Sequence, residues 1–190
     1  MSLESRKIRT FSGLLVSPLK PEAVSILDVA HGLAGLRRYN AQSPLRYTVA
    51  QHSVDVMHRV RVKLSPNLAL RPRPETLRVM REALLHDAHE AYCGDITSPV
   101  KKLLPALAAA EKECAAHVRQ KLGLPYSLNP VVKECDVESY YEELERLWRP
   151  DDGTGFKVWD SDRAKSEFLD AYYNITHAIE RADRKVAALG

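Results

Sequence analysis

The chain has 190 residues, of which 45% are apolar and 28% are charged, and its formal net charge is +3. This size and balance predict one globular domain over residues 1–190, large enough to bury a core of its own. The small net charge does not by itself indicate a nucleic-acid-binding protein. The first ten residues contain no apolar h-region, and no apolar run approaches the length of a membrane span. We therefore expect a cytoplasmic protein that does not enter a membrane.

Helical spacing dominates the sequence. Apolar residues recur at steps of three and four, and prolines and glycines interrupt the pattern. It predicts helices over residues 21–37, 48–64, 75–93, 98–104, 106–122, 130–149 and 162–188. Residues 10–16 could form a short extended or hairpin segment. The predicted fold class is all-α, a single compact domain of about six to seven helices.

Capping residues mark several of the predicted helix ends. Thr48 and Gln51 have the spacing of a capping box, and Asn129 precedes a proline suited to a first helical turn. Pro21 suits the first turn of the helix predicted there, and Gly94 is a good residue for ending a helix. Either Ser161 or Asp162 could cap the last helix.

The cysteines do not form a recognisable framework. There are three, an odd number, and no two of them are close in sequence. Neither a set of disulfides nor a CxxC zinc site fits this pattern. We interpret them as small buried residues in a reducing compartment.

The pair His86-Asp87 is the strongest chemical signal. It follows an apolar run inside the predicted helix 75–93, where a charged carboxylate is costly unless a partner compensates it. A divalent cation is such a partner, and imidazole with carboxylate suits several first-row metal ions. Glu90 is expected one helical turn after His86, on the same face, and Asp95 follows it.

Two more residues of ligand type lie on other predicted helices, His52 on 48–64 and Asp136 on 130–149. The gaps along the chain allow three helices to bring ligands to one bundle interior. Taken singly, each residue has an ordinary interpretation. His52 would be a capping or core histidine, and Asp136 would be an acid on a helix surface.

Taken together, these residues resemble a known signature. The order of a His, then a His-Asp pair, then an Asp is that of the HD-domain phosphohydrolases. The segments YTVAQHS at 47–53 and LLHDAHEAYCGDITSPVK at 84–101 are similar to the small branch of that superfamily. This branch contains bacterial deoxyribonucleoside 5′-monophosphatases and phage dATP triphosphohydrolases. The resemblance extends over residues 8–150, most of the chain.

The resemblance implies a metal centre with two acids beside it. The residues that match the metal ligands are His52, His86, Asp87 and Asp136. They would hold one divalent ion such as Co, Mn or Zn, with Mg as a further candidate. Glu90 and Asp95 match the acidic pair that positions or activates water and assists the leaving group.

The resemblance also implies substrate-binding residues. Arg38 and Tyr39 match an arginine and the aromatic residue after it, and here Tyr stands where Trp or Phe is usual. Arg37 is an alternative for the phosphate role, because the alignment of this loop could shift by one residue. Lys101 is a further phosphate-binding candidate.

The implied reaction is metal-dependent hydrolysis of a deoxyribonucleotide. We favour a dNTP triphosphohydrolase of the dATP type, which releases the nucleoside and triphosphate. The alternative is a deoxyribonucleoside 5′-monophosphatase, which cuts the same ester and releases phosphate. A signalling-nucleotide phosphodiesterase and a non-catalytic module that binds nucleotide or nucleic acid are more distant alternatives.

The expected partners are a small-molecule nucleotide and other copies of the chain, since the branch tends to form homo-oligomers. The basic residues around 59–81 are interpreted as a solvated face, so nucleic acid is not expected. An aromatic stripe is assigned to the core, with a subunit interface as the alternative. Its residues are Tyr140, Tyr141, Leu144, Leu147 and Trp148.

Overall fold

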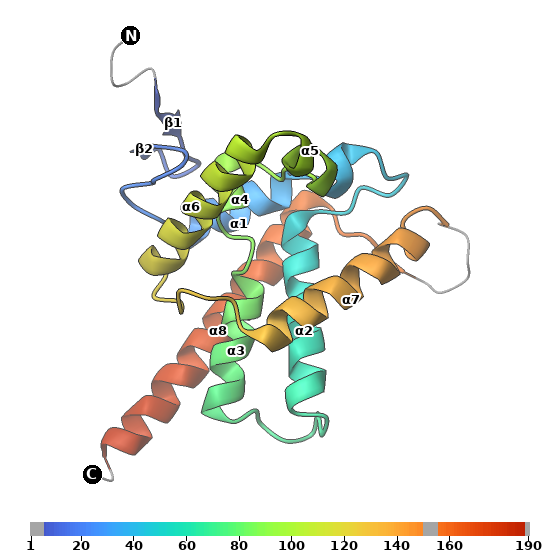
Figure 1. Ribbon diagram of the computed structural model, residues 1–190. Coiled ribbons are helices and arrows are strands. Elements are labelled where there is room, and N and C mark those ends of the chain that lie inside the picture. Colours follow the sequence, from blue (N-terminus) through green and yellow to red (C-terminus); the bar gives the residue numbers. More distant parts are fainter. Residues whose placement is uncertain (1–5, 150–155, 189–190) are drawn as a thin grey trace.

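A computed structural model describes residues 6–149 and 156–188, and all structural statements concern these residues. In this part the chain forms eight α-helices, one 3-10 turn and a two-stranded hairpin (Figure 1). The elements are β1 (Ile8–Arg9), β2 (Leu15–Val16), α1 (Ile26–Gly35), η2 (Arg38–Ala41), α2 (Val49–Leu64), α3 (Pro74–Leu84), α4 (Glu90–Cys93), α5 (Ser98–Leu103), α6 (Pro105–Lys121), α7 (Pro130–Arg146) and α8 (Ser161–Ala187). The all-α prediction is confirmed.

Helix α2 is the centre of the domain. It packs against α1, α3, α7 and α8, and Figure 1 shows α7 crossing it. Its side chains from Val49 to Val54 are all buried, so the first turns of this helix are enclosed on every side. Any polar group in those turns must find its partner inside the protein.

Helix α8 supports the bundle along much of its length (Figure 1). Its buried residues Ala164, Phe168, Ile175 and Ile179 recur at helical spacing and face α1, α2 and α3. The N-cap is Asp160, whose side chain accepts a hydrogen bond from the Arg163 N–H. The predicted caps, one and two residues later, are therefore wrong, because the helix begins one residue earlier than expected.

The cap predicted at Thr48 is confirmed: its hydroxyl accepts from the Gln51 N–H at 3.1 Å. The Gln51 side chain does not return to the helix end as a capping box requires. It bonds instead to the backbone of Lys157 and Trp159, at 2.9 and 2.8 Å. This glutamine therefore ties the segment before α8 to the buried start of α2.

The predicted helix 75–93 is in fact two helices, α3 and α4, separated by a turn over residues 85–89. Nδ1 of His86 donates to the carbonyl oxygen of Ala83 at 2.7 Å. In a continuous α-helix that oxygen would accept from the N–H of Asp87. The imidazole therefore competes with the helix at the His-Asp pair, which explains why the helix ends there.

The helix predicted over 21–37 begins only at Ile26, so Pro21 does not occupy its first turn. The Pro21 carbonyl oxygen lies 3.0 Å from Nε2 of His117 on α6. This contact holds the segment before α1 against another helix. The hairpin β1–β2 pairs antiparallel on either side of a turn, as the extended segment predicted near residues 10–16 suggested. None of the helices in the described ranges is both long and apolar enough to cross a bilayer.

A glycine allows α1 to approach α4 closely. A Cβ added at Gly32 would lie 2.8 Å from Cβ and 3.0 Å from Cα of Ala91, closer than carbon atoms pack. Gly35 in the same helix would meet nothing within 4 Å. The absence of a side chain at Gly32 thus sets the position of α4 and of Glu90 at its start.

We expect Gly32→Ala to lower the free energy of unfolding by about 1–3 kcal/mol, because the overpacked contact has backbone on one side. Gly35→Ala is the matched control and should be neutral or stabilising by up to about 1 kcal/mol, since alanine favours the helix. Urea unfolding measures both. Equal effects of the two substitutions would contradict the proposed close contact.

Candidate metal centre and active site

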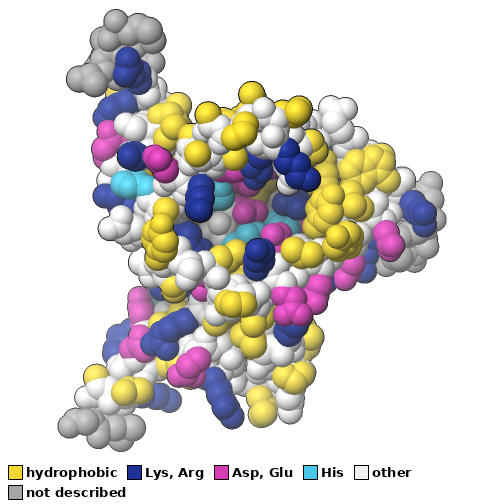
Figure 2. All heavy atoms as spheres, viewed as in Figure 1, with side chains coloured by type: hydrophobic (Ala, Val, Ile, Leu, Met, Phe, Trp, Pro, Cys, Tyr) yellow, Lys and Arg dark blue, Asp and Glu magenta, His cyan; other side chains and the backbone are white. Residues whose placement is uncertain are grey.

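Two histidines from separate parts of the chain lie close together. His52 comes from the buried start of α2, and His86 comes from the turn between α3 and α4. Their ring centroids are 5.2 Å apart, and the His52 side chain is fully buried. Figure 2 shows a hollow in the surface with histidine and acidic side chains at its floor.

The hydrogen bonds of both rings indicate which nitrogen carries a proton. Nδ1 of His86 faces the Ala83 carbonyl oxygen, and Nδ1 of His52 lies 2.7 Å from Oε1 of Glu143. Both oxygens can only accept when Glu143 is ionised, so each Nδ1 is the donor. In the neutral rings each Nε2 then has its lone pair free, as metal-binding histidines require.

Two carboxylates face these Nε2 atoms. Oδ2 of Asp87 lies 3.1 Å from Nε2 of His86 and 3.7 Å from that of His52. Oδ1 of Asp136, on α7, lies 3.1 Å from Nε2 of His52 and 3.7 Å from that of His86. Neither Nε2 atom makes a well-formed hydrogen bond to the described residues, although both are buried.

This arrangement fits a divalent metal ion. Neutral imidazole lone pairs and carboxylate oxygens repel one another unless a cation or a proton lies between them. Metal–ligand bonds of about 2.1 Å place neighbouring ligand atoms roughly 3.0–3.4 Å apart, close to the separations found here. His52, His86 and Asp87 form a cluster that could hold a metal ion, and Asp136 lies beside it.

The pKa shifts of His86 and Asp136 also indicate that a cation or protons must lie between the clustered groups. Burial opposes the charged form of His86, but Asp87 and Asp136 raise its pKa well above the ordinary value. Burial likewise opposes ionisation of Asp136, but the two histidines hold its pKa far below the usual range. Without a metal the cluster retains protons, and a metal ion would replace them.

Glu90 and Asp95 lie next to this cluster. Glu90 is buried at the start of α4, and within the described residues its Oε2 has no hydrogen-bond partner. Burial, followed by the charges of Asp87 and Asp95, raises the pKa of Glu90 well above its ordinary value. Burial also raises the pKa of Asp95. An unpaired carboxyl with a raised pKa is suited to accept and release a proton near neutral pH.

Arg38 and Tyr39 meet a carboxylate that also contacts the metal centre. Oε2 of Glu143 accepts from Nε of Arg38 and from the hydroxyl of Tyr39, each at 2.8 Å. Oε1 of the same side chain accepts from His52 and, at 3.0 Å, from Ser139. Only Nε of Arg38 has a hydrogen-bond partner among the described residues, so its terminal nitrogens can still meet an anion.

The other two phosphate candidates are placed differently. Arg37 donates to the carbonyl oxygen of Arg46 at 2.5 Å and to the hydroxyl of Ser161 at 3.4 Å, so its guanidinium is engaged away from Glu143. Between the two arginines, the structure therefore favours Arg38. Lys101, on α5, pairs with the buried Glu111 at 3.0 Å, and its charge acts on Asp95.

Assigning the whole aromatic stripe to the core was wrong. Leu147 is buried, but Tyr140, Tyr141 and Trp148 are 41%, 64% and 42% exposed, and Leu144 is also exposed. The ring of Tyr39 stacks near Tyr140 at 6.3 Å and meets Trp148 edge-on at 5.1 Å. These three rings form an aromatic wall next to Arg38.

A family model described as "5'-deoxynucleotidase YfbR-like" matches residues 29–152. The chain is also similar to the uncharacterised protein YfdR of Escherichia coli, with 32% identity over 163 residues, 85% of this chain and 83% of the relative. An uncharacterised protein of Rhodobacter capsulatus is 30% identical over 164 residues, 82% of this chain and 76% of the relative.

The chain belongs to the YfbR-like family. It is thus a metal-dependent HD-domain phosphohydrolase, as the resemblance of its motifs implied. The matched range includes the histidines, Asp87, Asp136 and both acids next to them. The family supports deoxynucleotide phosphohydrolase activity and a divalent metal ion, without naming the metal.

Two buried acids around this YfbR-like centre, Glu143 and Glu111, are not predicted from the sequence. Glu143 lies seven residues after Asp136, two helical turns along the same face of α7. That spacing could have signalled its position. Glu111 had no comparable signal, because its partners Lys101 and His89 belong to other elements.

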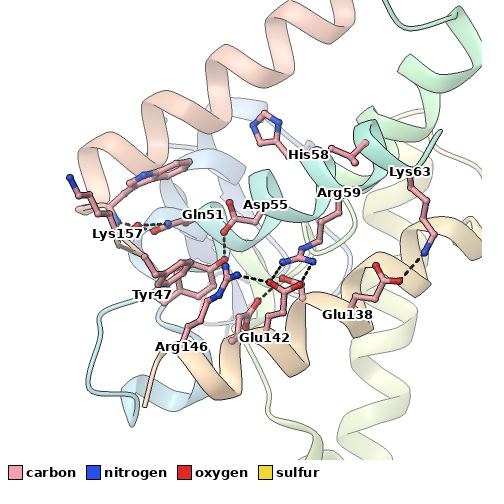
Figure 3. A pocket seen from close by; sticks show the side chains of 15 residues that line it. Tyr47, Gln51, Asp55, His58, Arg59, Lys63, Glu138, Glu142, Arg146 and Lys157 are labelled. Atoms are coloured by element: carbon pink, nitrogen blue, oxygen red, sulfur yellow. Dashed lines mark hydrogen bonds and ion pairs between the residues drawn. The ribbon is translucent and has the colours of Figure 1, made fainter. Parts of the chain in front are cut away.

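A second cleft, of about 730 Å³, lies behind Glu143, between α2, α7 and the segment before α8 (Figure 3). Two of its basic groups are paired with acids: Arg59 makes two bonds of 2.7 Å to Glu142, and Lys63 contacts Glu138 at 2.8 Å. The cleft is large enough for a ligand, but acids pair with several of the basic side chains that line it. Its lining does not include His52, His86 or Asp87. We therefore assign the chemistry of this YfbR-like protein to the hollow with the histidines.

His86→Ala should weaken binding of Co²⁺ at least about 10-fold, since it removes one imidazole ligand from the cluster. His177→Ala is the control: this histidine is exposed on α8, and its ring stacks near that of Tyr173. Isothermal titration with Co²⁺, on proteins whose fold is verified by circular dichroism, measures both. If His86→Ala bound the ion as tightly as the control, the assigned centre would be wrong.

Proposed function

We propose that this protein hydrolyses deoxyribonucleoside 5′-monophosphates to deoxyribonucleoside and phosphate at a single divalent metal ion. The observation that carries the proposal is the cluster of two Nε2 lone pairs and two carboxylates with the unpaired carboxyl of Glu90 beside it. The description of the matching family as a 5′-deoxynucleotidase supports this substrate class.

In the proposed mechanism His52, His86, Asp87 and Asp136 hold the ion. When bound, the ion supplies Lewis-acid stabilisation of a phosphoryl oxygen and lowers the pKa of water. Glu90 accepts the proton of the attacking water, because its carboxyl is buried, lacks a hydrogen-bond partner at Oε2 among the described residues, and has a raised pKa. Asp95, whose pKa is also raised by burial, assists departure of the nucleoside by donating a proton to its 5′ oxygen.

Arg38 and Lys101 orient the phosphate in this proposal. Both cations lower the pKa of Asp95, although burial raises it overall, so both act on the acid assigned to the leaving group. The terminal nitrogens of Arg38 match the spacing of two phosphate oxygens. Two cations and a divalent ion suit the charge of a monophosphate. Tyr39 borders the same region, because it follows Arg38 and its ring is part of the aromatic wall.

A dNTP triphosphohydrolase of the dATP type is the second candidate. The aromatic wall of Tyr39, Tyr140 and Trp148 favours it, because exposed rings next to a phosphate site can stack on a purine base. Figure 2 also shows basic side chains on the rim of the hollow, which could meet a longer phosphate chain. A nucleic-acid-binding module is less well supported, since Arg59, Lys63 and Arg78 are paired with acids.

Glu90→Gln should lower kcat by about 10²–10⁴-fold, because glutamine cannot accept the proton of water. The KM and the affinity for Co²⁺ should change little, since the side chain keeps its shape. Glu113→Gln, an exposed acid on α6, is the control and should have no effect. Steady-state kinetics with dAMP and Co²⁺ measure these values, and near-normal turnover by Glu90→Gln would remove it from the mechanism.

Product chromatography separates the two substrate classes. With dAMP and dATP offered separately, we expect phosphate and deoxyadenosine from dAMP and much slower turnover of dATP. Release of intact triphosphate from dATP, with dAMP inert, would instead establish the second candidate. Boiled protein and protein treated with a chelator are the controls.

A further inference from the structure

Glu143 connects two parts of the site that are far apart in the sequence. Its side chain is buried on α7, and its two oxygens accept four hydrogen bonds. One oxygen holds Nδ1 of His52, and the other holds Arg38 and Tyr39. A carboxylate offers about four lone-pair positions, so none remains for a direct contact with an ion or a substrate.

The bond to His52 determines how that ring can bind a metal. Because Nδ1 donates its hydrogen bond to Glu143, the lone pair of Nε2 is directed at Asp87 and Asp136. Partners of this kind fix the tautomer and the orientation of a ligating histidine. The affinity for the ion should therefore depend on Glu143, although Glu143 is not a ligand.

The bonds to Arg38 and Tyr39 hold a strained loop. Tyr39, Asn40 and Ala41 have φ values of 59°, 51° and 58°, three successive left-handed residues without a glycine. Such conformations are costly for residues with a Cβ and persist only where surrounding contacts enforce them. The Tyr39 hydroxyl and the Arg38 Nε both end on Glu143, so this one carboxylate provides the side-chain anchor of the loop.

We propose that Glu143 is a positioning residue that couples the metal ligand His52 to the loop Arg38–Ala41, so that ion affinity and loop order depend on each other. The proposal rests on the proposed function only in taking His52 as a ligand and this loop as the substrate side of the site. Coupling of this kind is reciprocal: a change in the loop must alter ion binding, and ion binding must stabilise the loop.

The test uses two readouts that require no turnover. The first is Co²⁺ affinity, measured by isothermal titration without nucleotide. The second is the fluorescence of Trp148, which contacts the Tyr39 ring, in a Trp159→Phe background that leaves Trp148 as the remaining tryptophan of the chain. A wrong substrate assignment would leave both measurements meaningful.

Glu143→Gln should weaken Co²⁺ binding about 10–100-fold and shift the emission of Trp148 to longer wavelength, because the amide offers one acceptor where the carboxylate offers two. Glu142→Gln is the matched control: it is the adjacent residue, pairs with Arg59 facing the second cleft, and should change neither readout (Figure 3). Unchanged Co²⁺ affinity or unchanged emission in Glu143→Gln would overturn the coupling.

Tyr39→Phe tests the coupling from the loop side, with little risk to folding because it removes one hydroxyl. We expect Co²⁺ binding to weaken about 2–10-fold, the size of an ordinary coupling free energy. A merely structural role for Glu143 would leave ion affinity unaffected by this loop substitution. Wild-type Co²⁺ affinity in Tyr39→Phe would therefore overturn the proposal even if Glu143→Gln failed to fold.

Discussion

The site depends on the electrostatic conflict between two imidazole lone pairs and two carboxylates. The buried His52 and His86 present free Nε2 atoms to the partly exposed carboxylates of Asp87 and Asp136 at the floor of the hollow. A proton or a divalent ion must lie between these groups, because like electron pairs in a low-dielectric interior are costly. Much of the surrounding structure can be understood as holding these four side chains at distances that a metal ion fits.

The turn between α3 and α4 shows how the backbone serves this purpose. Adjacent residues of a regular helix point about 100° apart, so one ion could not easily meet both His86 and Asp87. Nδ1 of His86 donates to the Ala83 carbonyl oxygen, and helix α3 ends there. This one hydrogen bond both fixes the tautomer of the imidazole and redirects the chain. The same hydrogen bond thus ends helix α3 and leaves Nε2 of His86 free to bind a metal ion.

Helix α7 contributes two carboxylates to the site. Asp136 faces the histidines directly, and Glu143, two turns later, fixes His52 from behind while it binds Arg38 and Tyr39. Burial raises the pKa of Glu143, but His52 and then Arg38 lower it to about 2, so this carboxylate remains an acceptor at neutral pH. Asp136 and Glu143 therefore belong to one connected network, in which both carboxylates contact His52.

The sequence by itself determined the helical class, most helix ends and the family, because periodicity, capping residues and the order of His, His-Asp and Asp are patterns readable along the chain. It could not determine the break after Leu84, the exposure of Tyr140 and Trp148, or that Arg38 and not Arg37 hydrogen-bonds to Glu143. Each of these depends on contacts between residues distant in the chain. Glu143 makes the reason plain: its partners His52, Tyr39 and Arg38 lie 91 to 105 residues away along the chain, and only the tertiary structure brings them to one carboxylate.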